Sequence, residues 1–227
     1  MAVANSTGRD TPDFLARHMV RCALKGALAT LEAETGAPYA SMVLLASDAD
    51  GAPVTLISQL ALHTRNLLRS SKASLLIDTS NAAGDAASGG RISLMGQLIS
   101  VPAAAVQARF LARHVLAAGY VGFADFGFYR FDVATAHFIE GFGRILPLPG
   151  KALRPPIADT SALAALEPEL LDLFRQRWPS VTGIDCEGVD LVRAGGAERL
   201  TFSEPAATVD AARDAAERCL EKYCAAQ

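Results

Sequence analysis

The residues best suited to chemistry lie where an apolar strand pattern gives way to a helix pattern, in LISQLALHTRNLLRS at 56–70. A helix N-terminus exposes unpaired N–H groups and the positive end of the helix dipole, which together attract anions. Ser58 and Thr64 can add hydroxyl donors, His63 can donate a further hydrogen bond, and a guanidinium such as Arg65 grips phosphate. The junction therefore predicts an anion site, but a plain Thr64 helix cap beside solvent-facing neighbours explains it equally well.

Other groups that could do chemistry are scattered along the chain. Arg91 opens a strand pattern and is a second cation for the same site, although a solvated arginine is the usual case. His18, His114 and His137 are isolated in sequence, so each is expected to be a packed or surface histidine. None of the four cysteines lies in a Cys-x-x-Cys pair, which favours plain thiols and no metal.

The composition is that of an ordinary globular chain. Half of its 227 residues are hydrophobic (51%), enough for one large domain or for a medium domain with a small one. The formal net charge of −3 argues against nucleic acid or an anionic membrane as a partner, because both call for a basic face. No apolar run reaches the roughly 18 residues of a membrane span, and the N-terminus does not look like a signal peptide. We therefore expect a cytoplasmic protein.

Hydrophobic periodicity predicts short strands with few helices. The sequence DADG between two apolar runs is a strong hairpin signal. Five or six strands with only two or three helices favour a small barrel over a doubly wound sheet. The strand patterns cover residues 39–47, 53–58, 73–79, 91–101 and 128–143, and the helix patterns cover residues 12–33, the end of the 56–70 junction and a segment that starts at Pro102.

A break in the pattern divides the chain. Residues 146–156, LPLPGKALRPP, hold four prolines and a glycine with little to bury, which predicts a linker. We therefore expect a first domain over residues 1–150, a barrel with an N-terminal helix. Residues 157–227 are expected to form a small α-β-β-α domain, with a hairpin at Gly195-Gly196 and a closing amphipathic helix.

The order of these segments resembles the pyridoxamine 5′-phosphate oxidase-related superfamily of FMN-binding split β-barrels. The motifs that carry the resemblance are PYAS, LxxHTRNL, RxxLxG and DFxxYRF…GFGR, in that order over nearly the whole chain. The branch it most resembles is the HugZ-like haem-utilisation group, whose barrel is followed by a small α/β domain. The resemblance implies an α+β fold with a split β-barrel, and an FMN-dependent oxidoreductase.

The resemblance also implies roles for individual residues. Ser41 and Met42 would lie beside the flavin ring, and Arg91 would make a polar contact to it. Many relatives have lysine where this chain has His63, which is charged only near or below a pKa of about 6.5 unless the phosphate raises it. The family builds its flavin sites at a homodimer interface, so two such sites per dimer are expected. The residues that would hold the FMN phosphate are Ser58, His63, Thr64, Arg65 and Asn66.

The chain also departs from the family pattern. A true pyridoxamine phosphate oxidase has a C-terminal Arg-x-His motif, and this chain has no histidine after His137. The haem-degrading relatives take an axial histidine from the same region, so here His137 or His114 would have to serve with a different geometry. Haem binding is therefore the alternative to FMN, and a cofactor-binding module without turnover is a third possibility. The small-molecule substrate and the catalytic residues are not identified by the sequence.

Overall fold

The computed structural model describes residues 10–79, 89–140, 144–157, 159–194 and 196–226. Its strands form an eight-stranded antiparallel sheet of order β2-β1-β5-β6-β7-β4-β3, with β8 paired to β7, and a three-stranded sheet of order β11-β10-β9. The large sheet curls into a split barrel, which confirms the expected fold class. The strands are β1 (Lys25–Leu31), β2 (Pro38–Leu44), β3 (Ala46–Ser47), β4 (Pro53–Ser58), β5 (Lys72–Asp78), β6 (Arg91–Val101), β7 (Phe126–Ile139), β8 (Ile145–Pro149), β9 (Val181–Asp185), β10 (Gly188–Arg193) and β11 (Gly196–Thr201).

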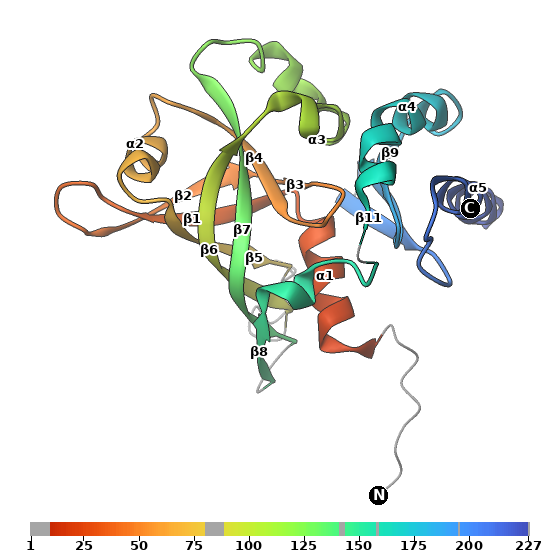
Figure 1. Ribbon diagram of the computed structural model, residues 1–227, viewed down its shortest axis with the longest axis horizontal. Helices are drawn as coiled ribbons and strands as arrows, with labels where there is room; N and C mark the ends of the chain where they lie inside the picture. The colour runs from red at the N-terminus through yellow and green to blue at the C-terminus, as the bar shows by residue number, and fades with distance from the viewer. Residues whose placement is uncertain (1–9, 80–88, 141–143, 158, 195, 227) are drawn as a thin grey trace, which may run out of the picture.

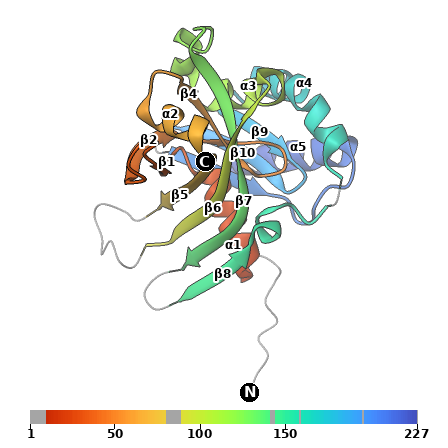
Figure 2. The same cartoon turned by 60° about the vertical axis from the view of Figure 1, so that its left-hand side comes forward.

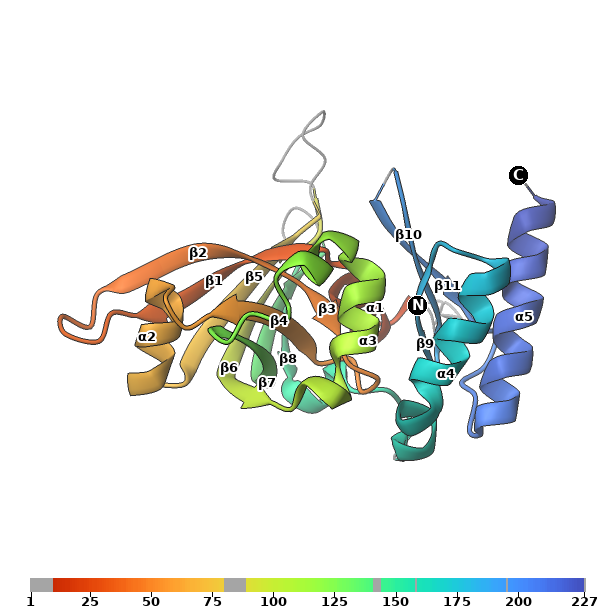
Figure 3. The ribbon, with the colours of Figure 1, turned by 90° about the horizontal axis from the view of Figure 1, so that it is seen from above.

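The helices surround and separate the two sheets. Helices α1 and α3 lie between the barrel and the small sheet (Figure 1). Helices α4 and α5 lie along the side of the small sheet that faces away from the barrel (Figure 3). The α-helices are α1 (Pro12–Cys22), α2 (Leu62–Arg69), α3 (Gln107–Arg113), α4 (Ser161–Arg177) and α5 (Val209–Ala225), and the 3₁₀ turns are η2 (Ala103–Ala105), η3 (Val115–Gly119) and η4 (Gly150–Leu153).

The predicted helix over residues 12–33 is wrong beyond its first half. Helix α1 ends at Cys22, the next residue is extended, and β1 follows between β2 and β5. A Cβ on Gly26 would lie 2.9 Å from the backbone oxygen of Leu76, so β1 can approach β5 this closely only with glycine there. The small apolar residues of this segment fit both a helical and an alternating pattern. The segment forms a strand because β2 and β5 pair with it on its two sides.

The predicted linker over residues 146–156 is also wrong in part. Strand β8 pairs with β7, and η4 places buried residues against the barrel core. The prolines of β8 are tolerated because the strand lies at an edge of the sheet. Gly150 allows the close approach, since a Cβ there would lie 1.9 Å from the Val133 oxygen. The linker is therefore shorter than its proline content suggested.

The C-terminal part contains one strand more than the predicted α-β-β-α order. The predicted hairpin is present as β10 and β11, although Gly195 lies outside the described residues. The additional strand, β9, is buried along its whole length and pairs with β10. Its sequence VTGID is too short and too interrupted by glycine to stand out as a strand pattern. The observed order is α-β-β-β-α.

A buried network of charges joins the barrel to the C-terminal part. Arg21 of α1 is 1% exposed and donates to Asp185 of β9 at 2.5 Å. Arg109 of α3 donates to Glu167 of α4 at 2.5 Å and lies 3.5 Å from Asp190. Burial alone would raise the pKa of the Asp185 carboxyl, but nearby arginines outweigh it and hold the pKa well below its usual range. The two parts of the chain therefore share a tightly paired interface.

Candidate functional site

The β4–α2 junction is held by its own hydroxyl groups. The Thr64 hydroxyl is fully buried and donates to the backbone oxygen of Ser58 at 2.7 Å. The Ser58 hydroxyl donates to the Asp125 carboxylate and accepts from the Leu60 amide at 3.1 Å. Both hydroxyls are thus engaged within the protein, and a carboxylate lies at the end of the strand.

The next two residues of α2 point in opposite directions. Arg65 is exposed. Asn66 is buried, and its Nδ2 donates to the Thr30 hydroxyl of β1 at 3.0 Å. Its Oδ1 is buried without a hydrogen-bond partner among the described residues. Asn66 therefore ties α2 to the barrel, whereas Arg65 is available to an external group.

Ser41 and His63 come together on the inner side of β2. The Ser41 hydroxyl lies 3.0 Å from His63 Nδ1, and His63 Nε2 is buried without a partner among the described residues. Burial lowers the pKa of His63, so the imidazole is neutral at pH 7. Met42 is 64% exposed on the other face of β2, because neighbouring strand residues point to opposite faces. Ser41 and Met42 therefore do not face one surface within a protomer.

Arg91 lies far from α2 within one protomer. It pairs in register with Asp78 at the far end of β5, whereas α2 leads into the start of β5 at Lys72. Six residues of strand separate the two ends by about 20 Å. Arg91 and the α2 residues therefore cannot contact the same group of a ligand within one protomer.

The fit of an FMN phosphate at α2 is therefore partial. Among the described residues, the amides of Leu62 and His63 have no backbone partner, and Arg65 lies exposed beside them. These groups suit an anion. The Asp125 carboxylate, which accepts a hydrogen bond from the Ser58 hydroxyl, disfavours an anion at this place, because like charges repel each other.

A second candidate surface is the outer face of the barrel sheet. In Figure 2, strands β5 to β8 lie side by side with α1 behind them. Residues directly opposite one another in antiparallel strands point to the same face. One such row crosses six strands, from β2 to β8, and its members are Met42, Ala27, Leu76, Ser93, His137 and Pro147.

This outer-face row is apolar apart from Ser93 and His137. Leu76 is 41% exposed although it lies in mid-strand. His137 is exposed on β7 and makes no hydrogen bond or ion pair with the described residues. The other three histidines are engaged with a thiol, a hydroxyl or a backbone carbonyl. His137 is thus the histidine best placed to take an external ligand.

Sequence reasoning did not find the outer-face row, although a signal for it exists. Exposed and buried positions alternate in KGALATL of β1 and in the second half of β7. Each segment alone reads as an ordinary half-buried strand. Only the register shows that Ala27, Leu76 and His137 lie on one line.

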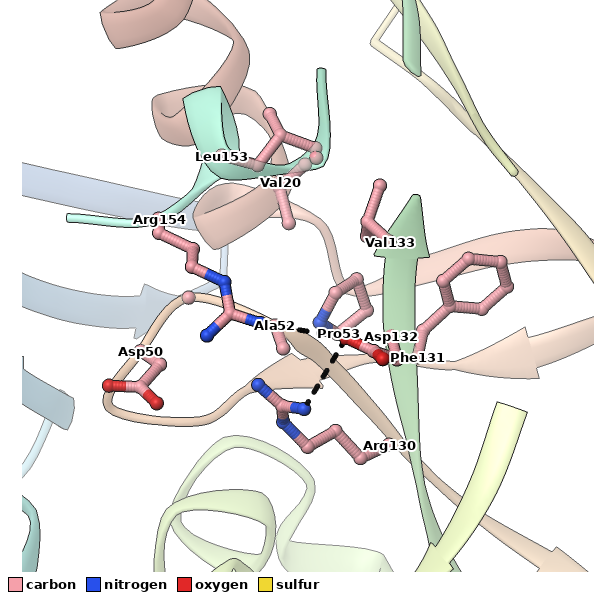
Figure 4. Close-up of a pocket in the computed structure, with 12 residues that line it drawn as sticks. Val20, Asp50, Ala52, Pro53, Arg130, Phe131, Asp132, Val133, Leu153 and Arg154 are labelled. Atoms are coloured by element: carbon pink, nitrogen blue, oxygen red, sulfur yellow. Dashed lines mark ion pairs between the residues drawn. The ribbon is translucent and has the colours of Figure 1, made fainter. Parts of the chain in front are cut away.

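A cavity beside η4 is too small to be the site. It lies between the β3–β4 turn, β7 and η4, and its volume is about 20 Å³. Figure 4 shows Arg130 and Arg154 pointing toward Asp132 at its mouth, at 3.9 and 3.6 Å. A volume of this size holds about one water molecule.

Known proteins resemble the barrel part of this chain. The model of a family described as "CREG, beta-barrel" matches residues 9–152. A chloroplastic protein of Arabidopsis thaliana named "Non-canonical heme oxygenase HOZ" is 39% identical over 109 residues. That match spans 47% of this chain and only 33% of the Arabidopsis protein.

Two solved structures cover almost the whole chain. A heme binding protein from Mycobacterium smegmatis is 26% identical with a TM-score of 0.60, and the match covers 94% of this chain and 99% of that one. The protein Atu2129 of Agrobacterium tumefaciens, of unknown function, is 24% identical with a TM-score of 0.77, covering 96% and 100%. The second likeness concerns the fold alone. Within the described residues, no helix is both long and apolar enough to cross a membrane.

Proposed function

The chain belongs to the CREG β-barrel family, and from this premise we propose that it binds haem on the outer face of its barrel. His137 would hold the haem iron through its imidazole. The observation that carries the proposal is an exposed histidine, next to last in the outer-face row, that makes no hydrogen bond or ion pair with the described residues. The names of the Arabidopsis and Mycobacterium relatives support the choice of haem.

The residues around His137 fit a flat apolar ligand. Leu76 and Ser93 lie within two strand spacings of it, about 10 Å, on the same face. Small and apolar side chains leave room for a ring to lie along the sheet. The Ser93 hydroxyl, directly across from His137, would orient the imidazole through its second nitrogen. When bound, haem would supply an iron able to react with dioxygen.

A second copy of the chain would cover the other side of the ligand. Leu31 and Met42 are 45% and 64% exposed on the face that carries the row. A contiguous apolar surface of this kind is typical of an interaction site. We therefore propose a homodimer with haem at the interface, and sedimentation at micromolar concentration should give the mass of two chains. A stable monomer that still binds haem would contradict the shared site.

The haem proposal is tested by titration of the full-length protein, followed by the Soret band. We expect saturation at one haem per chain and at least tenfold weaker binding by His137→Ala, because the iron loses its ligand. His63→Ala is the matched control and should bind as wild type does. Equal affinity of wild type and His137→Ala would place the site elsewhere.

FMN at α2 is the second candidate, favoured by Arg65 beside the open amides of Leu62 and His63. A charge-assisted hydrogen bond contributes roughly 1.5–3 kcal/mol, so Arg65→Ala should weaken FMN binding about ten- to a hundredfold. The affinity for riboflavin, which lacks the phosphate, should not change in Arg65→Ala. If the protein binds FMN tightly through Arg65 and does not bind haem, the haem proposal is wrong and the protein is a flavoprotein.

A further inference from the structure

Strand β11 is the last strand of the three-stranded sheet, so only β10 pairs with it. The Phe202 amide, one residue past β11, continues this ladder and donates to the Glu187 oxygen at 2.9 Å. The Val192 amide of β10 points the other way and donates to the Ser180 oxygen at 2.9 Å. Hydrogen-bonded and non-bonded pairs alternate along an antiparallel ladder. The residues of β11 whose N–H and C=O groups point away from β10 are therefore Ala197, Arg199 and Thr201.

These outward backbone groups of β11 have no partner, in contrast to the opposite edge of the sheet. At the opposite edge, the Ile184 amide of β9 donates to the Glu167 carboxylate at 3.1 Å, and the Ile184 oxygen accepts from Arg109 at 3.0 Å. No hydrogen bond from the described residues reaches the outward groups of β11. An unpaired strand edge is a template on which another strand can pair.

A groove lies on each side of this edge, because β11 runs between α1 and α5 (Figure 1). The α1 groove, between α1, the ends of β5 to β7 and β11, has a volume of about 650 Å³. The α5 groove, between β11 and α5, has a volume of about 640 Å³. Arg199 lines both, so both grooves reach the edge. None of the residues of the outer-face row or of the α2 site lines either groove.

The side chains of β11 show which face of the strand each groove lies on. Arg199 donates to Asp185, as Arg21 of α1 also does. The neighbouring Glu198 accepts a hydrogen bond from Tyr223 of α5. Successive residues of a strand point to opposite faces. The side chains of a strand added to β11 would therefore point alternately into the α1 groove and the α5 groove.

The α5 groove is basic. Arg218 and Lys222 line it, and because they are four residues apart they lie on one side of α5. Neither makes a hydrogen bond or an ion pair with the described residues. Among the described residues, no acidic side chain lines this groove. The α5 groove therefore suits acidic side chains of a partner.

The α1 groove is apolar over most of its lining. Its apolar side chains are Leu15, Met19 and Phe138. Its two carboxylates are engaged within the protein, Glu140 with Arg144 at 2.8 Å and Glu198 with the Tyr223 hydroxyl. This groove therefore suits apolar side chains of a partner.

We propose that the free edge of β11 binds an extended segment of another protein in which acidic and apolar residues alternate. The segment would pair with the outward backbone groups of β11 and so add a fourth strand to the sheet. Its acidic side chains would enter the α5 groove and its apolar side chains the α1 groove. A second copy of this chain fits less well, because a two-fold axis at the edge would bring Arg218 and Lys222 close to the same residues of the copy.

The test is calorimetric titration of the full-length protein with a short, end-blocked peptide of alternating glutamate and valine. We expect one peptide to bind per chain. A peptide of the same composition with its glutamates in one block should bind at least tenfold more weakly, because its side chains cannot match both grooves. An alternating peptide of lysine and valine should also bind more weakly. Equal affinities for the three peptides, or no binding of the first, would overturn the proposal.

Charge reversal in the protein tests the α5 groove. The double variant Arg218→Glu with Lys222→Glu should bind the glutamate–valine peptide at least tenfold more weakly than wild type and the lysine–valine peptide more tightly. Arg213→Glu changes an exposed residue of the same helix that does not line the groove, and is the matched control. Equal affinity of the double variant and Arg213→Glu would overturn the assignment. Haem titration of the double variant should match wild type, so this proposal and the haem proposal fail separately.

Methylated peptides test the backbone pairing without any change to the protein. Residues directly opposite each other in an antiparallel pair share a face, so the valines would lie opposite Ala197 and Arg199 and direct their N–H groups at β11. N-methylation of the valines should therefore abolish binding, whereas N-methylation of the glutamates should leave it unchanged. Equal binding of the two methylated peptides would contradict strand addition.

The variant Ala197→Pro removes one outward N–H group of β11 and leaves the ladder with β10 intact. It should bind the glutamate–valine peptide more weakly than wild type while its sedimentation is unchanged. If Ala197→Pro instead halves the mass of the protein in sedimentation, β11 pairs with a second copy of the chain and the peptide assignment is wrong.

Discussion

At the scale of single residues, a polar side chain that could contact a ligand can instead make hydrogen bonds that hold the fold together. Thr64 and Asn66 looked like ligand contacts in the sequence, and the structure turns both inward to hold α2 against the barrel. His63 is half-buried against Ser41. Only Arg65 remains available at the surface. A motif specifies residue types, and the fold decides which of them face outward.

Three half-buried histidines predict a loss of stability in mild acid. Burial lowers the pKa of His18, His63 and His114. Below the ordinary pKa of about 6.5 the unfolded chain therefore binds more protons than the folded one. The stability these groups contribute is present above that pH and is lost as the pH falls toward their lowered values.

Urea unfolding at about pH 7.5 and about pH 5.5 measures this effect. The midpoint should be lower at the acid pH, and His63→Gln should reduce the difference because one titrating group is removed. The comparison is made within each variant, so any general loss of stability cancels. An equal decrease of the urea midpoint between the two pH values in His63→Gln and in wild type would contradict this role for His63.

At the scale of elements, a close backbone approach explains why residues 146–156 are not simply the linker that their prolines predicted. Strand β8 and turn η4 pack against β7 at a point where no side chain fits. Gly150→Ala should therefore destabilise the protein by roughly 1–3 kcal/mol, as overpacking does. Gly119→Ala is the control, since a Cβ there meets nothing within 4 Å. Equal thermal midpoints for the two variants would show that β7 gives way easily.

The elements that sequence predicted were those specified by local chemistry. DADG forms the predicted hairpin turn, with Gly51 at φ 85° and the Ala52 amide bonded to Asp48 Oδ1 at 2.9 Å. Strands β5 and β6 and helices α4 and α5 also lie where their patterns predicted. Strand β1 was missed because its small apolar residues also fit a helical pattern, and β9 because its five residues are interrupted by glycine. The inward turn of Asn66 depends on Thr30 of β1 and was missed together with that strand.

At the scale of the whole molecule, the charge network makes the C-terminal part a structural partner of the barrel. Arg109→Met would leave Glu167 and Asp190 short of a buried partner and should cost about 3–5 kcal/mol. Arg177→Met breaks an exposed pair with Glu221 and should cost about 0–1 kcal/mol. Urea unfolding compares the two.

A rescue variant separates lost charge pairing from lost packing. Adding Glu167→Gln to Arg109→Met removes the orphaned charge and should restore part of the stability. If Arg109→Met is no more harmful than Arg177→Met, the network does not hold the two parts together.

The most direct test of the proposed haem site is chemical rescue of its ligand, His137. His137→Gly should bind haem weakly, with a Soret band shifted from that of wild type, because the iron has lost its nitrogen. Added imidazole should enter the space left by the side chain and restore the wild-type spectrum. A His137→Gly variant with the wild-type spectrum, or one that imidazole leaves unchanged, would contradict haem ligation by His137.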